Sequence, residues 1–323
     1  MSLNVGIIGT GWFADKHAHL LYGQEGVKVT AIAGSSQKKA DQFASNFNDA
    51  KGYDNVDDML DAGELDAVYI CTPPFAHGHF EQSLIERNIP FLVEKPLSSE
   101  AGLPKQLLQQ IEDKQLITSV GYHFRYMDSA LKAKQLLAER NIAVSLGYWM
   151  GDAPGGTWWR RQELSGGQFV EQTTHIVDLL RYLVGEVTEV YAAYSEGILS
   201  KQDSKANVAD AGTVTLKLSN GTIATISNTC IVPAGHESGL HIYTNAGKLE
   251  IGHGGVKDIT TASTTVYHNQ SNPYENEAIA FLHAVRTGDV SLIRSNYSDA
   301  YRTHQVTMAA NESASTGQVI KLV

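Results

Sequence analysis

Three short stretches of this 323-residue chain combine residue types that could do chemistry. In the first, Glu94-Lys95-Pro96 follows directly on an apolar, strand-like run. Proline fixes its own φ and biases the preceding residue toward extended backbone, so Lys95 could be aimed at a ligand instead of starting a helix. An aimed ammonium can hydrogen-bond a substrate hydroxyl. The alternative is a solvated lysine in a turn.

A second stretch aligns two acids with an imidazole. The apolar spacing predicts one helix from Phe169 to Leu183, and Glu171, His175 and Asp178 share one face of it at i, i+4 and i+7. This arrangement suits proton transfer by His175, with the carboxylates orienting its ring. Gly166-Gly167 just before it would let a ligand approach closely. A structural histidine on a half-buried helix is the alternative.

The third stretch, GTGWFA, has the spacing G-x-G-x-x-G/A between the first strand and the first helix. Glycines allow a tight turn and close backbone approach, while the helix N-terminus offers unpaired N–H groups to a pyrophosphate. A turn without a ligand is the alternative, but the position after strand one predicts a dinucleotide site. The residues expected at it are Gly9, Thr10, Gly11, Trp12, Phe13 and Ala14.

The elements that must position these residues fall into two patterns. Up to about Ser119, short and almost continuously apolar strands alternate with helical stretches, which is typical of a parallel sheet covered on both faces. We therefore expect a doubly wound Rossmann domain over residues 1–119, of class α/β.

Residues 120–323 have a different texture, with alternating strands and hairpin signals such as Ser219-Asn220-Gly221 and Asn245-Ala246-Gly247. This pattern predicts an α+β domain with a large, open, mainly antiparallel sheet. The apolar positions in TVTLKLS and TIATISN are expected to bury the open face against a second copy, giving a homodimer or homotetramer.

Composition excludes several classes of protein. Lysine plus arginine, 25, against aspartate plus glutamate, 35, gives a net charge of -10, and the scattered lysines do not suit nucleic acid. Cys71 and Cys230 lie in strand-like runs without metal or redox spacing, which indicates a reducing compartment. No apolar run approaches the roughly 20 residues that span a bilayer. We expect a cytoplasmic protein without membrane contact.

The carboxyl edge of the first sheet gathers further candidates, because doubly wound proteins bind ligands there. Thr72-Pro73-Pro74 would stiffen a loop at this edge, next to Glu94 and Lys95. His77 is expected beside the cofactor, with a structural role as the alternative. His77 and His79 are two residues apart and face different ways on a helix, so no metal site is expected.

Together these stretches resemble the glucose-fructose oxidoreductase / inositol dehydrogenase / rhizopine-catabolism family, Gfo/Idh/MocA. The resemblance implies an N-terminal Rossmann domain, a C-terminal domain whose open sheet makes oligomer contacts, and NAD(P)-dependent oxidation or reduction of a sugar, polyol or related hydroxyl compound. By position, Lys95 matches the family lysine that contacts the reacting hydroxyl and the nicotinamide, and His175 matches its acid/base histidine. Glu171 stands where the family often has aspartate, keeping the charge with a longer reach, and Thr173-Thr174 replaces the usual small residue before the histidine.

Two further segments are expected to contact substrate. In GTWWRRQELSGG, a tryptophan such as Trp158 could stack on a sugar ring, and Arg160 or Arg161 could bind hydroxyls or a carboxylate. One of the two tryptophans is equally compatible with a core position. His123 and Arg125, after the last Rossmann strand, are also expected to contact substrate.

The end of the second strand bears on the choice of cofactor. An NAD site usually carries Asp or Glu there, whereas this chain has Gly34, Ser35 and Ser36. The serines could donate hydrogen bonds to a 2′-phosphate, and Lys39 or its neighbour Lys38 could supply positive charge. The pattern favours NADP slightly over NAD, although the arginine often found at the Ser35 position is absent.

The sequence therefore predicts an NAD(P)-dependent oxidoreductase of a sugar, inositol or related polyol, with Lys95, His175 and Glu171 as catalytic residues. A catalytically silent sensor of dinucleotide or sugar would share the glycine turn but would not need both Lys95 and His175. A reductase of a tetrapyrrole or imine is less favoured, because Lys95 and His175 suit hydroxyl chemistry.

Overall fold

The computed structural model describes residues 2–322, which divide into two units. Unit 1 extends to Leu97 and adds Gly102–Gly121 and Tyr274–Tyr301; unit 2 comprises Ser98–Ala101, Tyr122–Pro273 and the chain from Arg302 onward. The sequence placed one contiguous boundary at residue 119, whereas the structure returns a late segment to unit 1. Residues 1 and 323, the ends of the two expected ranges, lie outside the described residues.

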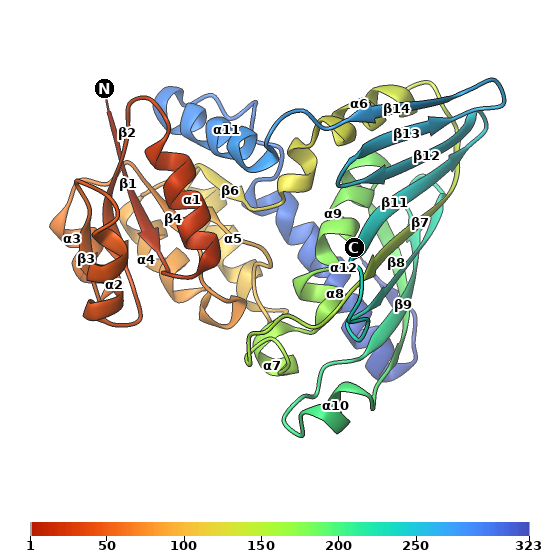
Figure 1. Cartoon of the computed structure of the whole chain (residues 1–323), viewed down its shortest axis with the longest axis horizontal. Coiled ribbons are helices and arrows are strands. Elements are labelled where there is room, and N and C mark those ends of the chain that lie inside the picture. Colours follow the sequence, from red (N-terminus) through yellow and green to blue (C-terminus); the bar gives the residue numbers. More distant parts are fainter. Residues whose placement is uncertain (1, 323) are drawn as a thin grey trace. The chain divides into compact units, whose positions relative to one another are not determined.

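Unit 1 is built on a six-stranded parallel sheet (Figure 1). Its order is β3 (Lys51–Tyr53), β2 (Val27–Ala33), β1 (Leu3–Ile8), β4 (Ala67–Ile70), β5 (Phe91–Val93) and β6 (Thr118–Val120). The sequence runs outward from β1 in both directions, which is the doubly wound Rossmann arrangement and confirms the predicted fold class. All four residues of β4 are buried, as expected for a strand covered on both faces.

The first helix of unit 1, Trp12–Tyr22, begins directly after the glycine turn, as the spacing motif predicts. The helix that follows β4 begins only at His79, because Pro74–Ala76 forms a 3-10 turn and Gly78 has a φ of +100°. The helices are α1 (Trp12–Tyr22), α2 (Gln37–Ala44), α3 (Val56–Ala62), η1 (Pro74–Ala76), α4 (His79–Arg87), α5 (Leu103–Lys114) and most of α11 (Pro273–Thr287).

Unit 2 contains a nine-stranded sheet in which β7 and β10 are parallel and the other neighbours are antiparallel (Figure 1). The two predicted turns join β9 to β10 and β11 to β12. The spatial order is β14 (Thr264–His268), β13 (Gly255–Ile259), β12 (Gly247–Gly252), β11 (Glu237–Thr244), β7 (Ile142–Met150), β10 (Ile223–Thr229), β9 (Ala211–Leu218), β8 (Val187–Ser195) and β15 (Ile320–Lys321).

One face of this sheet packs on helices, with a core that includes Ile176, Leu180 and Val306. The helical elements are η2 (His123–Tyr126), α6 (Asp128–Leu137), α7 (Gln162–Ser165), α8 (Gln168–Glu171), α9 (Thr174–Leu183), α10 (Leu199–Gln202) and α12 (Tyr297–Thr316), whose first residues belong to unit 1. None of the helices described in residues 2–322 has the length and apolar character needed to cross a bilayer.

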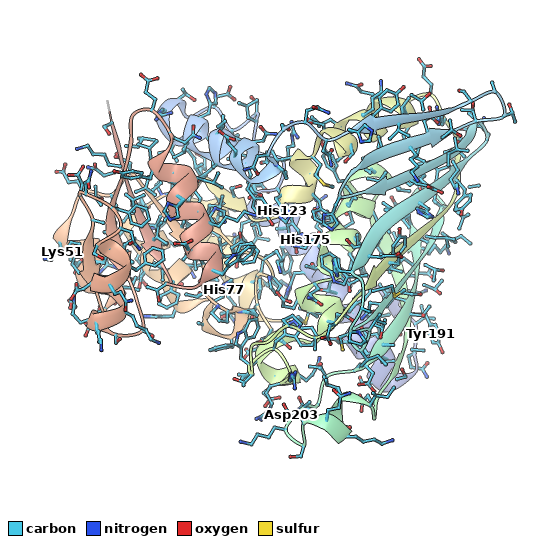
Figure 2. The ribbon with its side chains drawn as sticks, in the orientation of Figure 1. Lys51, His77, His123, His175, Tyr191 and Asp203 are labelled. Carbon is cyan, nitrogen blue, oxygen red and sulfur yellow. The ribbon has the colours of Figure 1, made fainter. Side chains whose placement is uncertain are left out.

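The two faces of the sheet carry different residues from those expected. Except for Ile223, the apolar positions of TVTLKLS and TIATISN, among them Val214, Leu216 and Ile226, are buried against the helices. These buried positions do not form the open face, so for them the expectation was wrong, and it holds only for Ile223. Side chains alternate across a strand, so the intervening Thr and Lys residues take the other side. The open face carries Tyr191 (Figure 2) and Ile223. Their exposed fractions are 46% and 52%.

The predicted single helix from Phe169 to Leu183 is also interrupted. It ends at Glu171 and restarts at Thr174, and the Thr173 N–H donates to the Gln168 carbonyl, five residues back. A fifth-residue bond widens the turn and changes which residues share a face. The i, i+4 relation assumed for Glu171 and His175 is therefore not present.

Candidate active site

The glycine turn of unit 1 is shaped for close approach. Gly9 has a φ of +120°, and a Cβ there would lie 2.5 Å from the Cys71 carbonyl oxygen, so only glycine fits. Gly11 caps α1, and a Cβ there would enter open space. The third position, Ala14, is fully buried in the core of unit 1. The turn thus leaves the α1 N-terminus accessible to an anionic group.

A cavity of about 530 Å³ lies beside this turn. Among the predicted cofactor residues, those that line it are Gly9, Thr10, Gly11, Ser35, Thr72 and Pro73. Its wall also includes residues that the sequence analysis did not assign, notably Asp54, Phe75 and His79. The volume, the glycine turn and the helix N-terminus together fit part of a dinucleotide.

At the end of β2, one predicted serine lines the cavity and the other supports a helix. Ser36 is the N-cap of α2, and its hydroxyl accepts from the Lys39 N–H at 3.4 Å. The Lys39 ammonium donates to the Ser35 hydroxyl at 3.1 Å, which places a positive charge next to a cavity residue. Gly34 is crowded, since a Cβ would lie 3.1 Å from the Ala40 nitrogen.

The His77 side chain contacts two loops at the carboxyl edge of the sheet. Its ring is 5% exposed and lies between two carbonyl oxygens, with Nε2 3.0 Å from that of Thr72 and Nδ1 3.2 Å from that of Leu97. The Glu81 carboxylate lies 3.7 Å from Nδ1. Of the two roles considered for His77, this geometry supports the structural one.

Glu94 and Lys95 follow β5 directly. Glu94 is 5% exposed and its carboxylate is 2.7 Å from His17 Nε2, so it does not line the cavity as expected. Lys95 is half-buried, and its peptide bond to Pro96 is cis. The charge of Glu94 also acts on Cys71, where burial, followed by this carboxylate, raises the pKa of the thiol well above its usual value.

In unit 2, His175 lies inside a cluster of aromatic rings, next to His123 (Figure 2). It is 4% exposed and near-parallel to Phe124 and Trp149, with interplanar angles of 18° and centroid distances of 4.8 and 5.8 Å. His123 meets it edge-on at 4.8 Å, and Tyr122 does so at 6.0 Å. The imidazole is therefore fixed in plane and position by its neighbours.

The polar groups near His175 have hydrogen-bond partners other than the predicted ones. Asp178 is fully buried and accepts two 2.7 Å hydrogen bonds from Arg125, so it serves an ion pair and Arg125 is directed into the core. The Tyr122 hydroxyl is 2.8 Å from the Thr174 hydroxyl. Burial, assisted by the Asp178 charge, raises the pKa of Tyr122 well above its usual value.

The segment around Trp158 and Trp159 separates into a core residue and a more accessible one. Trp159 is 1% exposed, and its indole N–H donates to the Glu171 carboxylate at 2.7 Å. Trp158 is half-buried and packs against the small hydrophobic cluster that contains Trp159. Arg160 pairs with Asp203 at 3.3 Å, and Arg161 pairs with Glu163.

The sequence analysis missed two histidines that lie near the aromatic rings around His175. His236 lies edge-on to Trp149 at 5.1 Å, where Gly151 leaves room because a Cβ would approach its Nδ1 to 2.7 Å. His253 lies edge-on to Phe124 at 5.1 Å and 2.8 Å from the Ser238 hydroxyl. Burial, followed by His236, lowers the pKa of His253. Both lie in loops without periodicity, so no pattern pointed to them.

Comparison with known families matches two models in succession. Residues 3–122 match an oxidoreductase family with an NAD-binding Rossmann fold, and residues 124–250 match the GFO/IDH/MocA C-terminal domain. The chain belongs to the Gfo/Idh/MocA family. It is therefore an oxidoreductase with an NAD-binding domain.

Several members of the Gfo/Idh/MocA family resemble this chain along most of its length. An inositol 2-dehydrogenase from Rhizobium meliloti is 23% identical over 253 residues, covering 77% of this chain and 75% of the relative. The scyllo-inositol 2-dehydrogenase (NAD(+)) of Bacillus subtilis is 23% identical over 335 residues, covering 98% and 95%. The structure of GenD2 from gentamicin A biosynthesis, in complex with NAD, has a TM-score of 0.87 at 20% identity, covering 100% and 97%. This last likeness concerns the fold.

Within each unit, part of the Gfo/Idh/MocA site predicted from sequence comes together. Six predicted residues of unit 1 line one cavity, while Trp12 is 69% exposed and Glu94 is buried. In unit 2, His123 and His175 are in contact, and Arg125 is in the core. Within residues 2–322, no three His, Cys, Asp or Glu side chains are grouped as a metal site requires.

Proposed function

We propose that the chain is an NAD(P)-dependent dehydrogenase or reductase that acts on a CH–OH carbon of a sugar, an inositol or a related polyol. The observation that carries this proposal is the setting of His175. An imidazole held at 18° to both Phe124 and Trp149 is preorganised for proton transfer. The names of the inositol dehydrogenases among the relatives support the same substrate class.

The proposed roles divide between the units. The dinucleotide, held by the turn from Gly9 to Gly11 and by the loop at Thr72, would supply the hydride acceptor or donor. His175 takes or gives the hydroxyl proton, and Lys95 donates a hydrogen bond to the same oxygen as charge develops on it. For Glu171, whose carboxylate accepts a hydrogen bond from Trp159, the proposed role is that of a relay partner or substrate ligand.

Further substrate contacts are assigned to His123 and Trp158. His123 borders His175 directly, and Trp158 is the more accessible of the paired tryptophans. Arg160 and Arg161 could reach substrate only from their ion pairs with Asp203 and Glu163. The core position of Arg125 does not support a substrate role.

For the cofactor we propose that NADP is accepted, with a slight preference over NAD. Two observations support this proposal: Ser35 lines the cavity, and the Lys39 ammonium lies 3.1 Å from the Ser35 hydroxyl, so a hydrogen-bond donor and a positive charge are available for a 2′-phosphate. Asp54 lines the same cavity and acts in the opposite direction, since its carboxylate repels a phosphate.

We further propose a cytoplasmic homodimer or homotetramer assembled through the open face of the unit 2 sheet. Tyr191 and Ile223 give this face exposed apolar area. Cys71 and Cys230 are both free and buried, as expected for packed thiols in a reducing compartment.

A substrate screen tests the central proposal. The purified chain is incubated with NAD⁺ or NADP⁺ and a panel of inositols, aldoses and sugar phosphates, and the absorbance of the reduced nicotinamide is followed. We expect turnover with at least one polyol. If the chain binds a dinucleotide but oxidises no polyol of the panel, the proposed substrate class is contradicted and the sensor becomes the favoured reading.

A further inference from the structure

A buried histidine–carboxylate pair lies directly before Lys95 in unit 1. His17 Nε2 and Glu94 Oε1 are 2.7 Å apart although the residues are 77 positions apart in sequence, and their side chains are only 1% and 7% exposed. The glycine turn and the cavity do not require this pair, since neither residue lines the cavity. Ionisable groups are seldom buried unless they are paired, so its position calls for a reason.

The pair is held from several sides. The His17 ring packs against Tyr69 of β4 at 5.3 Å and lies edge-on to Tyr274 of α11 at 6.4 Å. Around the carboxylate, Gly121 provides the necessary space, because a Cβ there would lie 2.7 Å from Glu94 Oε2. Residues from α1, β4, α11 and the end of β6 therefore fix where the Glu94 carboxylate can be.

Chemistry assigns the donor in this pair. A carboxylate only accepts, so the His17 ring donates its Nε2–H to Glu94. Nδ1 of His17 is buried and has no hydrogen-bond partner among the described residues, so the bond to Glu94 is the ring's one anchoring polar contact. Removing the donor would leave a buried carboxylate unsatisfied, which favours movement of the carboxylate away from this position.

The charge of Glu94 affects the pKa values of the surrounding groups. Burial lowers the pKa of the Lys16 ammonium, while Glu94 and then Glu277 act in the opposite direction. Burial, with Glu94 and Glu277, raises the pKa of the Tyr274 phenol. The Lys16 ammonium lies over the Tyr274 ring, 3.1 Å from its centroid. A displaced Glu94 carboxylate would therefore disturb residues of α1 and α11 as well as its own strand.

Glu94 connects this pair to the residue that follows it. Its N–H donates to the Ile70 carbonyl at 2.9 Å, and the Gly121 N–H donates to the Val93 carbonyl at 2.9 Å, so the strand end is held by backbone bonds while the side chain is held by His17. We propose that His17 is a positioning residue, which holds the Glu94 carboxylate and thereby fixes the backbone that carries Lys95. This inference rests on the proposed role of Lys95 in the reaction.

The test compares His17→Leu, which removes the donor, with His17→Gln, whose amide can donate at similar reach. His19→Leu is the matched control, because His19 lies on the same helix with a 61% exposed side chain. Three quantities are measured on the full chain: kcat with the best polyol of the screen, the Kd of NADH by fluorescence, and the rate of trace acetylation of Lys95 relative to exposed Lys105 by peptide mass spectrometry.

For His17→Leu we expect kcat to fall about tenfold or more and the Lys95 to Lys105 labelling ratio to change about threefold or more, with the Kd of NADH within about threefold of wild type. His17→Gln should return both quantities to within about threefold of wild type, and His19→Leu should change none of them. A loss of turnover without a comparable loss of NADH affinity is what positioning predicts and general destabilisation does not.

A folded His17→Leu protein with wild-type kcat and labelling ratio would overturn the inference, and so would a His17→Gln protein as impaired as His17→Leu. If His17→Leu does not fold, Gly121→Ala displaces the Glu94 carboxylate with His17 in place and should change the same ratio. An unchanged ratio in folded Gly121→Ala would then refute it. If no polyol is turned over by wild type, the proposed function fails, but the labelling ratio still decides on His17.

Discussion

Arg125 and Asp178 form a bidentate ion pair in the interior of unit 2, with both hydrogen bonds at 2.7 Å and exposures of 3% and 0%. Asp178 also accepts from the Thr303 hydroxyl at 2.9 Å, and the Arg181 guanidinium lies 4.0 Å away. The pair joins η2 to α9 and α12. The position of His175 on α9 thus depends on an ion pair made by Asp178, a residue of the same helix.

Breaking this pair should destabilise unit 2. Arg125→Met leaves a buried carboxylate without its main partner, and we expect the free energy of unfolding to fall by about 3–5 kcal/mol. Urea unfolding followed by tryptophan fluorescence reports on unit 2, since three of the four tryptophans lie there. Arg161→Met removes an exposed pair and should cost less than about 1 kcal/mol. Equal stability of the two variants would contradict the structural role of Arg125.

Lys95→Ala and His175→Ala should each lower kcat by on the order of 100-fold, because each removes a group that acts on the reacting oxygen. The Kd of the dinucleotide should change only a few-fold. Lys105→Ala and His268→Ala, which remove exposed side chains, serve as controls. Turnover within a few-fold of wild type in both Lys95→Ala and His175→Ala would refute the assignment.

Cofactor preference should depend on Lys39. We expect wild type to bind NADPH at least as tightly as NADH, and Lys39→Glu to weaken NADPH about tenfold while changing NADH less than about threefold, because only NADPH carries the 2′-phosphate. Lys105→Glu, at an exposed position that does not line the cavity, is the control for net charge. Fluorescence titration gives each Kd. A wild type that binds NADH tenfold tighter than NADPH would contradict the proposal.

Assembly should depend on the open face of the unit 2 sheet. Tyr191 pairs in register with Thr215, which pairs with Thr225 and then Leu146, so one row across four strands presents these side chains. We expect a dimer or tetramer by sedimentation velocity at micromolar concentration. Tyr191→Lys combined with Ile223→Lys should shift it to monomer, whereas Val290→Lys, at a 53% exposed position of unit 1, should not. A monomeric wild type would contradict the proposal.

Stability should fall in mild acid because of His304. Its ring is 2% exposed, Nε2 lies 3.1 Å from the Glu100 carbonyl oxygen, and burial lowers its pKa from 6.5 to about 4. The unfolded chain takes up this proton near pH 6.5 but the folded chain only near pH 4. The free energy of unfolding should therefore be unaffected by this group above pH 6.5 and decline by on the order of 3 kcal/mol as pH falls from 6.5 to 4.

The variant His304→Gln isolates this contribution, because its amide can still donate to Glu100 but does not titrate. Urea unfolding of both proteins between pH 7 and 4 gives the comparison. The wild type should lose more stability than His304→Gln over this window. Parallel pH profiles for the two proteins would show that His304 does not titrate as described.

Local sequence patterns predicted most helices and strands of unit 1. The features that they did not predict depend on contacts between residues far apart in the sequence. The bounds of α1 follow from the glycine turn before it and Gly23 after it. The break at Gln172 was not foreseen, because the apolar stripe continues through it and only the tertiary setting widens the turn. Likewise, nothing near Arg125 in sequence indicates a partner 53 residues away.

The residues of the candidate site also divide into those that a local pattern marked and those that only packing positions. A spacing motif marked Gly9 and Gly11, which line the cavity, and a family position marked His175, which lies among aromatic rings. His236, His253 and Asp54 lie in loops, where position depends on packing and not on periodicity. The burial of Glu94 depends on His17 and Gly121, and sequence alone does not show that these three meet.

The return of Tyr274–Tyr301 to unit 1 has a consequence for the order of folding during synthesis. Phe281 and Leu282 of this segment complete the core that contains Val5 and Ile32, and the Ser295 carbonyl accepts from the Val120 N–H at the edge strand. When the ribosome has synthesised only the first 121 residues, the core of the NAD-binding sheet is therefore still incomplete. Its apolar surface stays uncovered through the synthesis of about 150 further residues, and transiently exposed apolar surface of this kind makes a nascent chain prone to aggregation.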